Sequence, residues 1–308
     1  MPPVLDPRVT ERRNPRSADI DLASPLAIVD LMNGEDRAVA DAVASQRERI
    51  ARAIELAEEA FRGGHRLFYV GAGTSGRLGV LDASECPPTF GSPPEMVQGI
   101  IAGGPVALVR SQEGAEDRPD GARADLTAAG VAAGDFVLGI AASGTTPYVR
   151  AALEFARTLG ARTGILACSP PAPELVQAVD VAIVPITGPE VVTGSTRLKA
   201  GTATKMVLNM VTTGAMVRLG KTYGNLMVDL QATNDKLKDR SERLVMTTTG
   251  LARDAARALL ADAHGHVKVA ITMQKLGLDR ASAIARLAEA GGVIRRVVPD
   301  APPPVETA

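Results

Sequence analysis

The sequence predicts an α/β protein with a doubly wound, five-stranded parallel sheet flanked by helices, followed by a small C-terminal helical module. Three observations lead to this prediction. Five short apolar runs are separated by enough residues for a helix, the runs are nearly continuous rather than alternating, and polar or glycine-rich loops follow several of them. Continuous apolar runs are typical of strands buried on both faces of a parallel sheet.

The composition limits the class of protein. The 308 residues can fill one large core with a small additional domain. Because 34 Lys and Arg balance 35 Asp and Glu, nothing favours nucleic acid or an anionic membrane as a partner. The chain has two cysteines, Cys86 and Cys168, and neither a secretion-type apolar start nor a long apolar run. These features predict a cytoplasmic protein without disulfides or structural zinc.

Residues 1–55 are expected to form an N-terminal arm and the start of a helix. Residues 1–30 are rich in proline, aspartate and arginine and lack a sustained period, so they should pack on a larger surface, and a partner subunit is one candidate. The apolar residues between Asp36 and Phe61 then recur at helical spacing, which predicts one helix that ends at Gly63-Gly64.

Residues 56–225 are expected to form the sheet domain. The helix expected at Pro147–Leu159 has proline in its first turn and Gly160 after its end, and the longest helix is expected at Lys199–Leu219. The methionines of that long helix are assigned to the core rather than to a cofactor. Residues 226–308 are expected to form a linker and a compact helical module. The predicted strands are Leu67–Val70, Met96–Ile101, Phe136–Ile140, Gly164–Ala167 and Val181–Val184.

Directly after the first strand, the string GAGTSG at positions 71–76 satisfies the GxGxxG pattern and leads into a helix. A dinucleotide site also needs an acidic residue at the carboxyl end of the second strand. The available residue, Glu95, stands at the beginning of that strand, so the nucleotide interpretation is weak.

A second loop, at positions 141–147, carries the hydroxyls of Ser143, Thr145 and Thr146 and again opens a helix. Hydroxyl groups, the free N–H groups of a first helical turn and the helix dipole together suit a compact phosphomonoester dianion. The alternative is that these side chains only cap a helix. Two such loops at the ends of neighbouring strands favour a common phosphate site.

A third polar cluster follows the fifth strand, where Arg197 and Lys199 either neutralise an anionic substrate or form an ordinary solvated helix start. The three histidines lie outside all of these loops, so carboxylates are the better candidates for acid–base chemistry. Candidates are Glu85, which is followed closely by Pro87-Pro88, and the acidic stretch Glu113–Asp117. Either could also be a plain surface or helix-start residue.

These segments together resemble the N-acetylmuramic acid 6-phosphate etherase family, which belongs to the sugar isomerase (SIS) proteins and serves bacterial cell-wall recycling. That family cleaves the C3 lactyl ether of its phosphosugar by elimination and then hydration, giving N-acetylglucosamine 6-phosphate and D-lactate. The resemblance implies the same lyase activity here, with a phosphorylated amino sugar as the partner and no cofactor. It rests on Gly71–Gly79, Asp82–Thr89, Ile101–Gly104, Glu113–Asp117, Ile140–Gly144, Thr146–Tyr148, Glu190–Ser195, Lys199–Thr202 and Gly224–Asp229.

The resemblance places the two active-site glutamates of the family at Glu85 and Glu116. Glu85 is expected to protonate the departing lactate and then assist water, and Glu116 to take the C2 proton. An acid that donates near neutral pH is usually shielded from water, so Glu85 is expected to be partly buried. The expected substrate-binding residues are Gly73, Thr74, Ser75, Ser84, Ser143, Gly144, Thr145, Thr146, Glu190, Ser195 and Lys199, with no metal.

Some relatives carry a basic residue where this chain has Thr145. Two other functions stay open: a non-catalytic regulator that senses phosphosugars, and a sugar-phosphate aldose–ketose isomerase. The presence of both Glu85 and Glu116 argues against the regulator. A homodimer is expected, with a partner that completes each crevice. The C-terminal module resembles a ubiquitin-associated-like domain, which transfers no binding role.

Overall fold

The computed structural model describes residues 6–230, 235–298 and 300–304. The chain divides into two compact units. The first comprises residues 1–84 and 95–212, and the second residues 85–94 and 213–308. None of the helices within the described ranges has the length and apolar character needed to cross a membrane.

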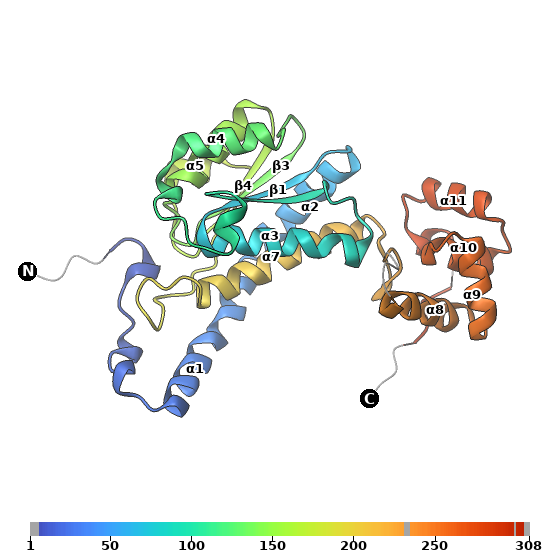
Figure 1. Cartoon of the computed structure of the whole chain (residues 1–308), viewed down its shortest axis with the longest axis horizontal. Coiled ribbons are helices and arrows are strands. Elements are labelled where there is room, and N and C mark those ends of the chain that lie inside the picture. The colour runs from blue at the N-terminus through green and yellow to red at the C-terminus, as the bar shows by residue number, and fades with distance from the viewer. Residues whose placement is uncertain (1–5, 231–234, 299, 305–308) are drawn as a thin grey trace, which may run out of the picture. The chain divides into compact units, whose positions relative to one another are not determined.

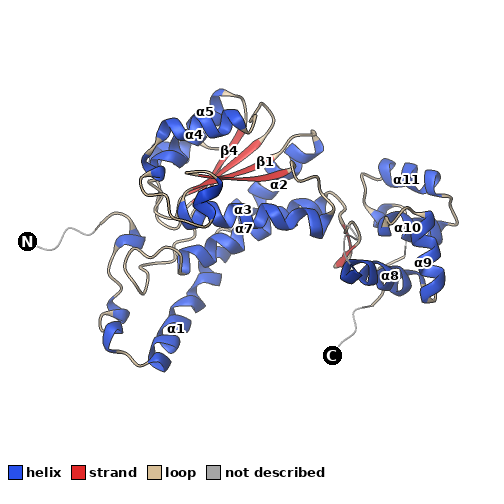
Figure 2. Cartoon of the chain, viewed as in Figure 1, coloured by secondary structure: helices blue, strands red, loops and turns tan. Residues whose placement is uncertain are grey.

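The first unit contains the five-stranded parallel sheet expected from the apolar runs (Figure 2). The strand order β2-β1-β3-β4-β5 makes β1 and β3 neighbours, and every pair is parallel. All residues of β1 and β3 are buried, as the continuous apolar runs predict. The strands are β1 (Leu67–Gly71), β2 (Val97–Ile101), β3 (Phe136–Ile140), β4 (Arg162–Leu166) and β5 (Val181–Ile183).

Helices cover both faces of this sheet, so the doubly wound prediction is confirmed (Figure 1). The helices α4 and α5 lie on one face, and α2, α3 and α7 lie on the other. Short 3₁₀ turns and α1 precede the sheet. The helices are α1 (Pro25–Ala44), α2 (Arg47–Arg62), α3 (Gly73–Phe90), α4 (Pro119–Ala128), α5 (Pro147–Thr158), α6 (Pro173–Ala178) and α7 (Lys199–Arg218).

The single helix expected from Asp36 to Phe61 is wrong, because α1 ends at Ala44 and α2 begins at Arg47. The side-chain oxygen of Gln46, which lies between them, accepts a hydrogen bond of 3.0 Å from the backbone N–H of Val184, just after β5. Apolar spacing cannot reveal this break, since the period continues across it while one polar side chain bonds to a distant strand end.

The helix that follows the first strand runs to Phe90 as α3, so Pro87 and Pro88 lie inside it. Proline removes a backbone donor but keeps helical φ, and the carbonyl of Pro87 still accepts from the N–H of Gly91 at 2.9 Å. The prolines therefore fall within the last turns of the helix rather than after it.

The second unit contains the helical C-terminal region, as expected. Its apolar core includes Val245, Val267 and Ile271. Gly277 has a φ of 64° and ends α10 in the left-handed conformation that glycine adopts without strain. The elements are the strands β6 (Thr222–Tyr223) and β7 (Leu226–Met227) and the helices α8 (Asp235–Thr249), α9 (Arg253–Asp262), α10 (Val267–Leu276) and α11 (Arg280–Glu289).

Candidate active site

A pocket of about 390 Å³ lies in the first unit, at the ends of β1 and β3. The start of α3, the loop between β3 and α5, and the turn containing Glu116 and Asp117 form most of its lining. Because β1 and β3 are adjacent and parallel, their carboxyl ends bring the two hydroxyl-bearing loops together. Seven of the predicted site residues line this pocket: Gly73, Thr74, Ser75, Glu116, Ser143, Thr145 and Thr146.

The first loop is shaped by a close approach of glycine backbones. A Cβ atom on Gly71 would lie 2.8 Å from the backbone nitrogen of Gly76. Gly73 has a φ of 53° and is the first residue of α3. The helix therefore starts almost directly at the end of β1, and its first residues, Gly73, Thr74 and Ser75, line the pocket.

The second loop is held by its own hydroxyls. The oxygen atoms of Ser143 and Thr145 are 3.0 Å apart, and Ser143 Oγ accepts the backbone N–H of Thr145 at 3.3 Å. Thr146 is the N-cap residue of α5 but makes no side-chain capping bond, so its hydroxyl is available to a ligand. Two helix N-termini and a set of hydroxyls thus converge on one pocket, which is suited to a compact dianion.

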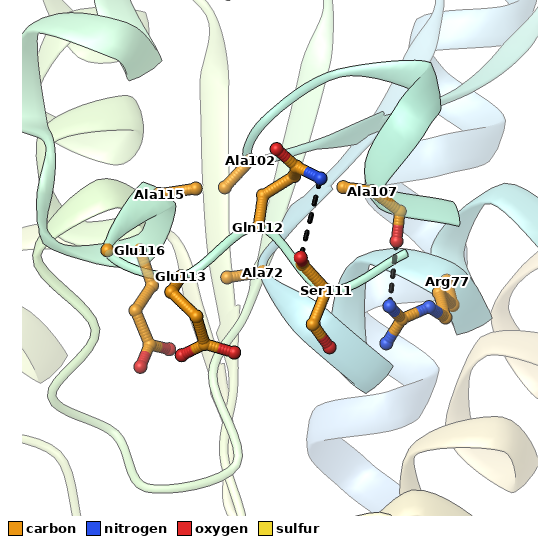
Figure 3. A pocket seen from close by; sticks show the side chains of 11 residues that line it. Ala72, Arg77, Ala102, Ala107, Ser111, Gln112, Glu113, Ala115 and Glu116 are labelled. Atoms are coloured by element: carbon orange, nitrogen blue, oxygen red, sulfur yellow. Dashed lines mark hydrogen bonds between the residues drawn. The ribbon is translucent and has the colours of Figure 1, made fainter. Parts of the chain in front are cut away.

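Glu116 connects this pocket to a smaller cavity of about 140 Å³ (Figure 3). Both cavities are lined by Ala72, Gly73 and Glu116. In Figure 3 the carboxylates of Glu113 and Glu116 point in the same direction. A carboxylate is therefore available beside the phosphate-suited loops, in a position to accept a proton from a bound molecule.

Arg77 borders the smaller cavity, and its guanidinium forms hydrogen bonds within the protein. It donates a hydrogen bond to the carbonyl oxygen of Ala107 at 2.7 Å (Figure 3). It also donates to the carbonyl oxygen of Leu108 at 3.1 Å. Arg77 therefore fixes the segment after β2, which leads to the turn carrying Glu116.

Glu85 is exposed, so the expectation that it is partly buried is wrong. It stands twelve residues after Gly73 in α3 and is not among the described residues that line the pocket. The helix turns Asp82 and Cys86, four residues apart, into the interior, and the adjacent Ser84 and Glu85 are left outward. Ser84 also does not line the pocket, and its hydroxyl donates to the carbonyl of Leu81 at 2.8 Å.

Glu190 and Lys199 have structural partners instead of the expected substrate contact. The buried carboxylate of Glu190 accepts the backbone N–H groups of Lys199 at 3.0 Å and Ala200 at 2.9 Å, at the start of α7. Burial raises the pKa of Glu190, and these hydrogen bonds oppose that shift. The Nζ of Lys199 forms a buried ion pair with Glu35 at 2.5 Å. Neither residue lines the pocket in the described chain.

Gly144 and Ser195 lie in pocket-lining loops without lining the pocket themselves. Gly144 has a φ of 75°, and a Cβ there would lie 3.1 Å from Cα of Pro171. Its role is to turn the second loop, since a side chain at this position would be strained and crowded.

Sequence reasoning missed the two charged lining residues that come from the N-terminal arm, Arg8 and Glu11. No motif marks them, and they lie at least sixty positions before the first phosphate loop. The arm was expected to pack on some larger surface. In the structure it packs on loops of its own chain, as the bond of 3.2 Å from Gly194 N to the carbonyl of Thr10 shows.

Comparisons with known proteins relate this geometry to other chains. Residues 49–157 match the family model described as the glucokinase regulatory protein N-terminal SIS domain. The chain is 52% identical over 294 residues to an N-acetylmuramic acid 6-phosphate etherase of Rhodopirellula baltica, covering 96% of this chain and 97% of that one. A relative with the same name from Gloeobacter violaceus is 55% identical over 286 residues, covering 93% of each chain.

A third relative of that name, from Mycolicibacterium smegmatis, is 53% identical over 289 residues and covers 94% of this chain and 97% of its own. Among solved structures, a phosphoheptose isomerase from Francisella tularensis is 17% identical with a TM-score of 0.48, over 61% of this chain and 98% of that one. The sequence relatives match over nearly their whole length.

Proposed function

The chain belongs to the N-acetylmuramic acid 6-phosphate etherase family, and from this premise we propose how its pocket serves the reaction. The activity is that of a carbon–oxygen lyase, which converts N-acetylmuramic acid 6-phosphate to N-acetylglucosamine 6-phosphate and D-lactate. The observation that carries the proposal is the convergence of two hydroxyl-bearing helix starts and Glu116 on one pocket.

The 6-phosphate binds between the starts of α3 and α5. There the amides of the first turn of α3 and the hydroxyls of Thr74, Ser75, Ser143, Thr145 and Thr146 are available within one cavity. A phosphomonoester carries close to two negative charges at neutral pH and has several strong acceptor oxygens, which these donors satisfy without a metal.

With the phosphate anchored there, Glu116 is the proposed base for C2 of the ring-opened sugar. The C2 proton is acidic because the adjacent aldehyde delocalises the resulting charge as an enolate. Glu116 takes that proton, the C3–O bond breaks, and lactate leaves with a proton from an acid. Water then adds its oxygen to C3 of the C2=C3 alkene while C2 regains a proton, which restores the sugar.

Glu85 is the proposed acid. Because it is exposed in the single chain, something else must shield it from water during the reaction. A carboxyl group that donates a proton in catalysis is usually shielded from water. We propose that a partner subunit covers Glu85 in a homodimer. Such a partner would provide the desolvation that a single chain lacks.

Apolar side chains around α1 support the homodimer. The exposed fractions are 84% for Leu22, 70% for Leu26 and 53% for Val29. Leaving three large apolar side chains in water on one segment is unfavourable, and a second copy would bury them symmetrically. Sedimentation velocity of the purified chain is expected to show a dimer, and the Leu26→Glu, Val29→Glu double variant is expected to shift it toward monomer. A wild-type monomer at micromolar concentration would contradict this arrangement.

A cytoplasmic location is supported by the cysteines. The chain has two cysteines, Cys86 and Cys168, and both are buried. Few cysteines without a disulfide framework are typical of proteins from reducing compartments. Fractionation of cells that express a tagged chain would test this, with the protein expected in the cytoplasmic fraction.

The lyase activity is tested by incubating the purified chain with N-acetylmuramic acid 6-phosphate and measuring D-lactate. Stoichiometric D-lactate and N-acetylglucosamine 6-phosphate are expected. Binding of phosphosugar without lactate would instead indicate the sensing regulator. Conversion to a ketose phosphate without lactate would indicate the isomerase.

A further inference from the structure

The charges around the pocket do not balance for an anionic ligand. Three carboxylates, those of Glu11, Glu116 and Asp117, line it. Among the described lining residues, the single cation is Arg8. A phosphate dianion that enters this pocket meets acceptors that repel it, so hydroxyls and amides alone leave part of that repulsion uncompensated.

The arm that carries Arg8 is fastened two residues away. Thr10 is fully buried, and its backbone N–H donates to Ser169 Oγ at 3.2 Å. The hydroxyl of Ser169 in turn donates to Thr10 Oγ1 at 3.2 Å, and the carbonyl of Thr10 accepts from Gly194 N at 3.2 Å. Gly194 itself lines the pocket. Arg8 is therefore positioned by buried contacts of its own chain rather than by a free tail.

The guanidinium of Arg8 is also oriented. Its Nε and Nη2 donate to the two carboxylate oxygens of Asp6 at 3.0 and 2.7 Å. The backbone carbonyl of Asp6 accepts from Arg12 Nε at 2.7 Å, which fixes the pair further. Arg8 Nη1 has no acceptor among the described residues. A guanidinium held by two of its nitrogens presents the third as a directed donor.

We propose that Arg8 binds the phosphate of the substrate, which makes the N-terminal arm part of the binding site. The inference rests on the proposed phosphosugar function of the pocket and adds a residue to it. Asp6 compensates part of the charge of Arg8 and orients its guanidinium, so Arg8 adds a directed, charge-assisted donor beside the pocket carboxylates. Loss of Arg8 therefore weakens binding of the phosphorylated sugar, and the weakening has an electrostatic signature.

The test measures binding of N-acetylglucosamine 6-phosphate, the proposed reaction product, by calorimetry on the full chain in the absence of D-lactate. Arg8→Ala is expected to raise the Kd about tenfold or more, because a hydrogen bond to a charged group is lost. Arg8→Lys, which keeps the charge without the fork, is expected to fall between Arg8→Ala and wild type. The matched control is Arg13→Ala, an exposed arginine on the same arm, with a Kd within twofold of wild type.

Ionic strength separates a direct contact from a merely structural one. Between about 50 and 500 mM salt, the screening length falls from roughly 14 to 4 Å. Over this range the affinity of the wild type is expected to fall more steeply than the affinity of Arg8→Ala. A Kd for Arg8→Ala within twofold of wild type would overturn the proposal. So would equal salt slopes with no recovery in Arg8→Lys, since that result would indicate only a loosened arm.

This outcome is independent of the lactate assay. If wild type binds the phosphosugar through Arg8 but releases no lactate, the lyase mechanism fails and the Arg8 site stands. If wild type releases lactate while Arg8→Ala binds the phosphosugar as wild type does, the Arg8 site fails and the lyase mechanism stands.

Discussion

Gly76 lies directly against the backbone of Gly71: a Cβ atom on Gly76 would be 2.7 Å from the carbonyl oxygen of Gly71. Real Cβ atoms do not approach backbone oxygen this closely, so both positions require glycine. The contact joins the end of β1 to the first turn of α3, where the proposed phosphate site begins. The GxGxxG string thus serves close packing of the first turn of α3 against the end of β1.

The Gly76→Ala substitution is expected to lower the free energy of unfolding by about 1–3 kcal/mol, because overpacking forces backbone to move. The matched control is Gly34→Ala in α1, where an added Cβ meets nothing within 4 Å. That change is expected to stabilise by up to about 1 kcal/mol, since alanine is the better helix former. Urea unfolding measures both, and equal effects at the two positions would contradict the packing argument.

Glu116→Gln is expected to reduce kcat for lactate release by roughly 10²–10⁴-fold, because the amide cannot take the C2 proton. Binding of N-acetylglucosamine 6-phosphate is expected to remain within about threefold of wild type, a range smaller than the loss of one charged hydrogen bond. Glu95→Gln, an exposed change outside the pocket, is the matched control and should leave kcat unchanged.

Deuterium exchange at C2 separates the two glutamates. In D₂O, Glu85→Gln is expected to lose lactate release but to keep exchange of the C2 proton, since its role follows proton abstraction. Glu116→Gln is expected to lose both. Exchange that survives in Glu116→Gln would show that another group is the base.

The strands could be predicted because burial on both faces demands continuous apolar runs, and the five runs lie within two residues of β1–β5. The two loops around Thr74 and Ser143 could be predicted because hydroxyls after neighbouring parallel strands must meet at one edge. These are local patterns combined with a simple topology, and the sequence carries both.

Other features depend on pairings between distant residues. Lys199 was expected to contact substrate, but its ammonium group bonds to Glu35, 164 positions away. Arg8 reaches the pocket only because Thr10 is anchored to Ser169. Glu85 is exposed because α3 is rotated so that Asp82 and Cys86, on its other face, are buried. A single sequence does not reveal these relationships, because contacts between distant residues leave no periodic or local pattern in it.

The buried Glu35–Lys199 ion pair is expected to contribute strongly to the free energy of unfolding. Burial alone would raise the pKa of Glu35, but the hydrogen bond and charge of Lys199, with Arg16, lower it. The pKa of Glu35 is therefore lower in the folded protein than in the unfolded chain. The stabilisation is present above the ordinary pKa of glutamate and is lost as the pH falls through the folded pKa. Glu35→Gln is expected to cost about 3–5 kcal/mol at pH 7, since Lys199 then stays buried without a countercharge.

The matched control for this pair is the exposed Arg150–Glu154 pair, whose side chains are 66% and 52% exposed. Glu154→Gln is expected to change the free energy of unfolding by less than about 0.5 kcal/mol. Urea unfolding at pH 7 and pH 4 measures both variants. If Glu35→Gln lowered the free energy of unfolding by less than about 1 kcal/mol, the loss would be well below that of a broken buried pair. Such a result would show that water reaches Lys199.

Cys168 is expected to make stability fall at high pH. Its thiol is fully buried, with Sγ 3.6 Å from the carbonyl oxygen of Ala200, and burial raises its pKa to about 12 from the ordinary value of 9.0. A raised folded pKa means that the protonated thiol is favoured in the native state. Its contribution is therefore complete below pH 9 and is lost as the pH rises toward 12, at about 1.4 kcal/mol per pH unit.

The comparison of wild type with Cys168→Ala isolates this slope, because lysines and tyrosines titrate in both proteins. At pH 7 the variant is expected to be the less stable of the two, since it leaves a small cavity. Between pH 9 and pH 10.5, roughly the lower half of the window set by the two pKa values, the wild type is expected to lose more unfolding free energy than the variant. Parallel pH profiles would mean that the thiolate is accommodated in the fold, and this would contradict the prediction.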